Sequence, residues 1–159
     1  MNGDEESDRR REAAGWLVIA REDVRVAHAC LALSPPALGV AAYHCQQAAE
    51  KVTKGLLVAA GVAFRKTHDI DELADLAASN YPECRDLLNT VRPLTVWGVA
   101  YRNPAAEDTP EPVPGRAELH QTIATIEQLA RRLHTANRPD PPPSPRTRDR
   151  EMNDEFGQP

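Results

Sequence analysis

The chain has 159 residues and a formal net charge of −5. This length suits one domain whose core buries about 70% of the surface that the unfolded chain exposes. The acidic balance excludes a protein that coats nucleic acid through an overall positive field, because such proteins neutralise phosphates with a dense basic surface. The three cysteines, Cys30, Cys45 and Cys84, form no CxxC pair, so we expect no disulfide framework, no metal and no cofactor.

The N-terminal dozen residues are mostly polar or charged. We expect residues 1–12 to be a polar extension, in which residues 9–12 can begin the first helix. The segment lacks the apolar stretch of a signal peptide, and no window approaches the length of a membrane-spanning helix. The sequence therefore predicts a cytoplasmic protein that does not contact a membrane.

Apolar residues recur at intervals of three and four between positions 16 and 31, which predicts a first helix with one buried stripe. The prolines at 35 and 36 end it, since neither ring can continue a helix. A second helix is predicted over residues 38–60. Gly61 follows it, where a left-handed cap is expected.

A third helix is predicted over residues 70–79, because Asp69 and Glu72 have the spacing of a capping box. His68 then lies just outside the N-terminus of this helix. Pro82 suits the first turn of a fourth helix. Pro93 must kink or end that helix, and we expect a break near Arg92.

The rest of the chain is divided by proline. Four prolines within residues 104–114 predict a rigid, exposed connection, and residues 116–135 have the apolar spacing of a last helix. Residues 138–159 combine prolines with alternating charges and predict a disordered tail. The domain therefore spans residues 13–137, and its fold class is all-α, an antiparallel bundle of about five helices.

Polar residues gather on one side of the second helix. The residues that share this side are His44, Gln47, Lys51 and Lys54, with Gln46 and Glu50 on its flank. One interpretation is a functional surface. The other is a solvated face with a Glu50–Lys54 pair worth about 0.3–0.5 kcal/mol.

His68 precedes a predicted helix N-terminus, where unpaired backbone N–H groups and the helix dipole favour an anion. If Lys54 lies nearby, a phosphate finds a cation, backbone donors and an imidazole. The alternative for His68 is a neutral residue that fixes the loop. Arg102 falls at a helix end, where it can bond the last carbonyls, bind a phosphate, or form a buried pair with Glu50.

Taken together, these motifs resemble the HEPN domains over residues 16–132. The family's Gln-Gln-x-x-Glu-Lys-x-x-Lys helix is matched by Gln46, Gln47, Glu50, Lys51 and Lys54. Its Thr-His-Asp turn is matched by Thr67, His68 and Asp69. Its Arg-Tyr-Pro turn corresponds to Tyr101-Arg102-Asn103-Pro104, in which the register of the aromatic residue differs.

The resemblance implies a fold and a class of partners more firmly than a reaction. Many members are metal-independent ribonucleases with an Arg, four to six residues and then a His. After Arg102 the corresponding positions, 107–109, hold no histidine. Arg21 and His28 match the spacing on the first helix, away from the expected location, and helical periodicity explains them. Whether the chain is an enzyme is therefore left open, with Arg102 and His68 as the catalytic candidates.

Our first hypothesis is a HEPN module that binds a nucleotide or an RNA phosphate. The expected binding residues are Gln47, Glu50, Lys51, Lys54, His68 and Arg102. By analogy with the family we expect a homodimer, and a minimal nucleotidyltransferase as partner in a toxin–antitoxin-like or defence system. One alternative is a divergent endoribonuclease toxin that uses His68 or His120 opposite Arg102. Another is a helical interaction scaffold without catalysis.

Overall fold

The computed structural model describes residues 3–100 and 112–139, and all regular secondary structure in these ranges is helical. The α-helices are α1 (Gly3–Ala32), α2 (Leu38–Ala59), α3 (Ile70–Asn80), α4 (Arg85–Val91), α5 (Trp97–Ala100) and α6 (Arg116–Ala136). Two 3₁₀ turns, η1 (Pro82–Cys84) and η2 (Arg92–Val96), flank α4. The predicted all-α antiparallel bundle is confirmed.

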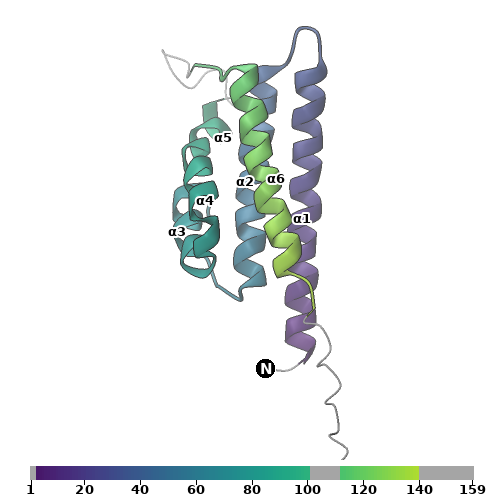
Figure 1. Cartoon of the computed structure of the whole chain (residues 1–159), viewed down its shortest axis with the longest axis vertical. Coiled ribbons are helices and arrows are strands. Elements are labelled where there is room, and N and C mark those ends of the chain that lie inside the picture. Colours follow the sequence, from purple (N-terminus) through teal and green to yellow (C-terminus); the bar gives the residue numbers. More distant parts are fainter. Residues whose placement is uncertain (1–2, 101–111, 140–159) are drawn as a thin grey trace, which may run out of the picture.

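Helix α2 occupies the middle of the bundle. In Figure 1, α1 and α6 pack along one part of α2, and the short helices α3, α4 and α5 form a layer on its other side. A Cβ atom on Gly55 would lie 2.5 Å from Cδ2 of Leu133, so α2 and α6 approach closely at this glycine. Gly61 has φ +69°, which confirms the predicted left-handed cap of α2.

Helix α1 begins at Gly3, earlier than the sequence predicts, so residues 3–12 of the predicted polar extension are helical. Ion pairs one helical turn apart join Glu6 to Arg10 and Asp8 to Arg11. Such pairs stabilise this first part of the helix, where no residue is fully buried. The acidic residues of the first turn also favour the positive end of the helix dipole.

The start of α3 differs in detail from a capping box. Asp69 caps the helix as predicted, accepting a bond of 2.9 Å from the N–H of Asp71. Glu72 does not bond back to Asp69, because the N–H of Asp69 donates instead to Oγ1 of Thr67 at 3.1 Å. The carboxylate of Glu72 pairs with Arg65, with a distance of 2.7 Å from Nε to Oε1. The second half of the predicted box is therefore wrong.

The predicted break near Arg92 is confirmed, because α4 ends at Val91 and the chain continues as η2. Pro93 lacks the N–H that an uninterrupted α-helix would use. Arg92 fixes the break against α3, where it contacts Asp71 at 2.7 Å and Asp75 at 2.6 Å.

The last helix extends one residue beyond the predicted range of 116–135. Most of the predicted connection over 104–114, and most of the predicted tail over 138–159, lie outside the described residues. Among the helices of the described ranges, none has the combination of length and apolar character that a membrane crossing requires.

Candidate functional site

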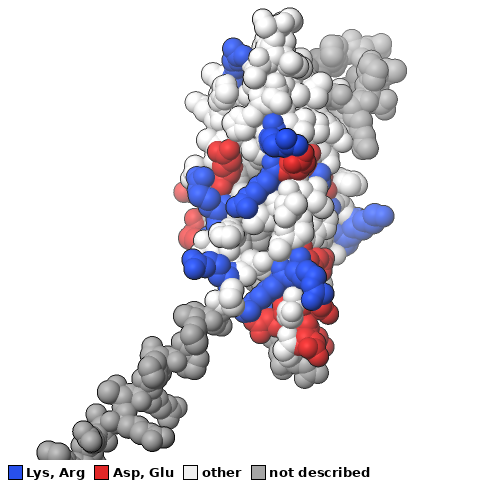
Figure 2. Space-filling model, turned by 90° about the vertical axis from the view of Figure 1, so that its right-hand side faces the viewer, with Lys and Arg blue, Asp and Glu red and all other residues white. Residues whose placement is uncertain are grey.

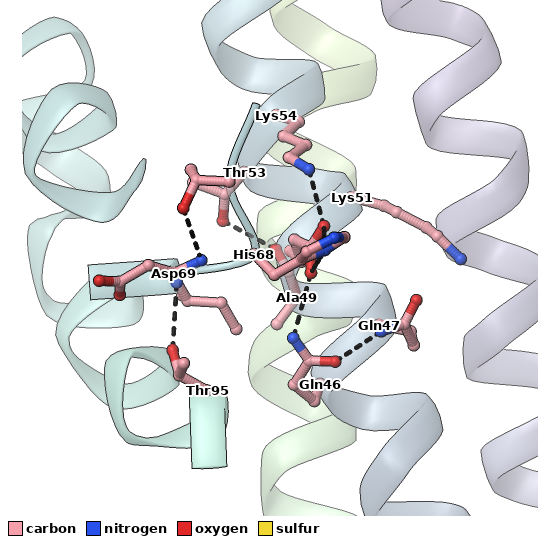
Figure 3. Close-up of polar contacts among 12 residues, drawn as sticks. Gln46, Gln47, Ala49, Lys51, Thr53, Lys54, His68, Asp69 and Thr95 are labelled. Atoms are coloured by element: carbon pink, nitrogen blue, oxygen red, sulfur yellow. Dashed lines mark hydrogen bonds and ion pairs between the residues drawn. The ribbon is translucent and has the colours of Figure 1, made fainter. Parts of the chain in front are cut away.

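A buried carboxylate lies at the centre of the polar groups on α2. Glu50 accepts a bond from Nε2 of Gln46 at 3.1 Å and one from Nζ of Lys54 at 2.7 Å. Nδ1 of His68 lies 3.0 and 3.2 Å from the two carboxylate oxygens. Figure 3 shows Gln46 and Lys54 approaching this point from the turns below and above, and His68 from the loop before α3. We call these four residues the Glu50 cluster.

The helical part of the Glu50 cluster is not a solvated face. Gln46, Glu50 and Lys54 are only 2%, 4% and 7% exposed. A buried charge is costly unless it is paired, and here each charge has a partner within hydrogen-bonding distance. The ammonium group of Lys54 also lies 5.6 Å from the ring centroid of Trp16 on α1, where the ring face attracts a cation.

His68 differs from the rest of the Glu50 cluster in its exposure, since 78% of its side chain is accessible. A carboxylate only accepts hydrogen bonds, so the imidazole donates from Nδ1 to Glu50. Nε2 lies on the opposite side of the ring and points away from the carboxylate. Glu50 therefore fixes the orientation of an imidazole that is presented at the surface.

The N-terminus of α3 does not offer the backbone donors that the sequence suggests. The N–H of Asp69 bonds Thr67, that of Asp71 bonds Asp69, and that of Ile70 donates to Oγ1 of Thr95 at 3.1 Å. These side chains satisfy amides that an anion would otherwise use. The expectation of free amides beside His68 is therefore wrong for residues 69–71, and side chains must supply most of the contacts to a phosphate here.

A second carboxylate, Asp23 of α1, forms a cluster of its own between α1 and α2. Its side chain lies 2.8 Å from Nδ1 of His44 and forms an ion pair with Lys51. Asp23 is 8% exposed. Lys51 extends toward α1 rather than toward Glu50 (Figure 3). We call Asp23, His44 and Lys51 the Asp23 cluster.

Asp23 is not among the predicted site residues, although the sequence contains a signal for it. Asp23 lies three residues after Ala20 and four before Ala27, within the apolar stripe of the first helix. A carboxylate at a buried position requires a partner. Two basic side chains, His44 and Lys51, lie about two turns apart on the next helix and supply it.

Two further residues support the Glu50 cluster. Nε2 of Gln47 donates to Oε1 of Gln46 at 2.7 Å, so Gln47 orients the amide that bonds Glu50. Gly98 of α5 lies against the same amide, because a Cβ atom on Gly98 would be 2.8 Å from its carbonyl carbon. Helix α5 therefore covers Gln46 only because position 98 has no side chain.

The predicted residues are thus brought together in part. Lys54 and His68 converge on Glu50, whereas Arg102, the third expected contact, lies outside the described residues. His28, half of the formal Arg21–His28 pair, contacts Glu127 of α6 at 3.2 Å, on a different part of the surface.

Cysteine chemistry and a metal centre receive no support from the described residues. All three cysteines are buried. Burial, with a smaller contribution from nearby Cys30, raises the pKa of the Cys45 thiol to about 12, so this thiol remains protonated at neutral pH. No group of three His, Cys, Asp or Glu side chains with the arrangement of a metal site occurs within residues 3–100 and 112–139.

Fold and site together define a class of protein, an all-helical domain whose central helix carries a buried carboxylate and presents an oriented imidazole. The family model described as HEPN domain matches residues 13–135, and the chain belongs to the HEPN family. It is also similar to TT1696 from Thermus thermophilus, a crystal structure, with 25% identity and a TM-score of 0.60. That similarity covers 79% of this chain and 98% of TT1696. The comparison with curated proteins gave no match.

Proposed function

We propose that this HEPN protein binds the phosphate of a nucleotide or of RNA at the exposed edge of the Glu50 cluster. The observation that carries the proposal is the contact of 3.0 Å between Nδ1 of His68 and Glu50, in a histidine whose side chain is 78% exposed. An imidazole held in this way presents Nε2 at a fixed angle. When the ring is protonated, Nε2 donates a charge-assisted hydrogen bond to a phosphate oxygen.

The surrounding charges support an anionic ligand. Each buried carboxylate is balanced by one lysine, Glu50 by Lys54 and Asp23 by Lys51. The Glu50–Lys54 pair therefore leaves no unbalanced negative charge in the Glu50 cluster to repel an anion that contacts His68. A phosphate can be attracted to such a local site even though the whole chain is acidic.

The biological setting is proposed from family membership. We place the protein in the cytoplasm, as a homodimeric component of a toxin–antitoxin-like or defence system that includes a minimal nucleotidyltransferase. A two-component arrangement fits a domain that holds a nucleotide or RNA phosphate and leaves nucleotidyl transfer to its partner.

Calorimetric titration of the full chain with ATP and with single-stranded RNA tests this function. We expect His68→Ala to weaken binding by about tenfold or more, the effect of losing one charge-assisted hydrogen bond. The matched control is His28→Ala, because His28 is also an exposed histidine that contacts a carboxylate, with 48% of its side chain accessible. Equal affinities of the native chain and His68→Ala, or no binding by the native chain, would contradict the proposal.

A second candidate function is a metal-independent endoribonuclease, favoured by the same oriented imidazole. A histidine whose Nδ1 is held by a carboxylate can move a proton through Nε2, as general acid–base catalysis requires. The test is RNA cleavage in the presence of a metal chelator. Cleavage that is lost in His68→Ala and in Arg102→Ala, but kept in His28→Ala, would establish this function in place of simple binding.

A further inference from the structure

The side of α1 that faces away from the bundle carries a stripe of residues that are small or apolar except for Glu22. Residues recur at alternating intervals of four and three, the spacing of the a and d positions of a coiled coil. The residues of this α1 outer stripe are Gly15, Ile19, Glu22, Val26 and Ala29 of α1, and Leu33, the first residue after the helix ends. All are exposed except Val26, which is half-buried, and Ile19 and Leu33 retain 48% and 55% of their accessible surface.

Gly15 leaves open space on this stripe, into which another helix could pack closely. A Cβ atom on Gly15 would meet nothing within 4 Å, so packing inside the subunit does not require a glycine there. Glycine in the interior of a helix is also less favourable than alanine. A closely packed partner helix would explain a position without a side chain.

The stripe is complementary to itself when a second copy runs in the opposite direction. In an antiparallel pair each a position faces a d position of the other helix. Gly15 then faces the partner's Leu33, and Ile19 faces the partner's Ala29. Each of these pairs joins a large side chain to a small one, as close packing requires. The pair nearest the axis places Glu22 against the partner's Val26.

The charges of α1 fit the same arrangement. Glu22 and Arg25 form an ion pair on the exposed surface, with 58% and 76% of their side chains accessible. Figure 2, which views the molecule from the side of α1, shows groups of positive and negative charge both in the middle and at the lower end of this face, with uncharged surface between them. In the antiparallel pair Glu22 lies beside the partner's Arg25 and Arg25 beside the partner's Glu22, so the charged group is matched across the axis.

We infer that the α1 outer stripe is the surface through which two copies of this chain associate, antiparallel and about a two-fold axis near position 24. The inference rests on the homodimer of the proposed function and names its interface. Asp23 lies on the flank of the stripe that faces α2. The two-fold axis is perpendicular to the plane of the two helices, so both Asp23 clusters lie on the same face of this plane, and the partner contributes its own His44 and Lys51 to one shared polar surface.

Sedimentation equilibrium of the full chain tests the interface. We expect a dimer at micromolar concentrations, and at least about tenfold weaker association for Ile19→Asp and for Leu33→Asp. The matched control is Val96→Asp, because Val96 of η2 is 49% exposed, like Ile19, but lies in the layer of short helices on the other side of α2. A monomeric native chain, or a dimer that both α1 substitutions leave intact, would overturn the inference.

Cysteine cross-linking tests the direction of the two helices. Residues 19 and 29 of one helix are about 15 Å apart at 1.5 Å per residue, too far for a disulfide within a subunit. The double variant Ile19→Cys/Ala29→Cys should form a covalent dimer under mild oxidation, and Ile19→Cys alone should not. The opposite pattern, with the single variant cross-linked, would contradict the antiparallel arrangement.

The interface and the proposed function can fail separately. If Ile19→Asp is monomeric and still binds ATP with an affinity that His68→Ala reduces, both the interface and the phosphate site are supported. A native dimer that dissociates on Ile19→Asp but binds neither ATP nor RNA supports the interface and removes the proposed function.

Discussion

The Glu50 cluster and the Asp23 cluster use the same three chemical groups for different ends. In each, a buried carboxylate contacts one lysine and one histidine. Lys54 and Glu50 belong to the same helix, and only His68 comes from outside it. Asp23 belongs to α1, and both of its partners belong to α2.

The exposures of the two histidines show what this difference does. The side chain of His68 is 78% exposed, whereas that of His44 is 23% exposed. The Asp23 cluster therefore joins two long helices, and most of the imidazole of His44 is covered in this contact. In the Glu50 cluster, Gln46 and Lys54 of the same helix already bond the carboxylate, so the imidazole of His68 remains available to a ligand. The topology of the partners, rather than their chemical identity, decides which cluster can act.

Among the substitutions that test this comparison, Glu50→Ala should have the largest effect on the free energy of unfolding. It leaves the ammonium group of Lys54, 7% exposed, without its carboxylate. Loss of one partner from a buried pair costs about 3–5 kcal/mol. Urea denaturation should show this loss in the free energy of unfolding. Glu50→Gln keeps the volume and one acceptor oxygen and should cost less, and equal stability of Glu50→Ala and the native chain would contradict our account.

Asp23→Ala should have a smaller effect, about 1–3 kcal/mol for the lost bonds between α1 and α2. Lys51 need not remain buried without its partner, because its side chain is already 20% exposed and can extend into water. The same denaturation measurement ranks the two carboxylates. A larger loss for Asp23→Ala than for Glu50→Ala would reverse the comparison.

Gly98→Ala sharpens the comparison because it affects the Glu50 cluster alone. The added methyl group would lie 2.8 Å from the amide of Gln46, so α5 or the amide must shift. We expect a cost of about 1 kcal/mol, at the low end for overpacking because the amide is at the end of a flexible side chain. The check is a double-mutant cycle with Gln46→Ala. If the strain arises at this contact, Gly98→Ala should cost almost nothing in the Gln46→Ala background.

The smallest effect on stability is expected for His68→Ala. A side chain that is 78% exposed contributes about 0.5 kcal/mol or less. His44→Ala should cost more, about 1 kcal/mol, because His44 bonds a buried aspartate. Thermal unfolding of the two variants in parallel measures the difference. A larger loss for His68→Ala would mean that His68 supports the fold rather than a ligand.

The sequence predicts those features of the fold that depend on local signals. The second helix was expected over residues 38–60 and spans Leu38–Ala59, since prolines precede it and a left-handed glycine follows it. The cap at Asp69 and the break at Arg92 have equally local causes. The capping box does not form, because the N–H of Asp69, which would donate to Glu72, donates instead to Oγ1 of Thr67.

The candidate site depends on contacts that the sequence does not encode locally. Helical spacing places Gln46, Glu50 and Lys54 on one side of α2, but it does not say whether that side faces water. Helix α5 and the loop before α3 decide this, because they cover the side and bring His68 to Glu50. Asp23 could not be paired with His44 and Lys51 until α1 and α2 were aligned.

The contact between Lys54 and Trp16 gives the protein an intrinsic optical reporter. The ammonium group lies 5.6 Å from the centre of the indole ring. Indole emission responds to a nearby charge, so a ligand that shifts Lys54 will change the fluorescence of Trp16. The other tryptophan, Trp97, is 9% exposed and can be replaced by phenylalanine to isolate this signal. Ligand binding at the Glu50 cluster can thus be followed in solution by the fluorescence of Trp16, without an attached dye.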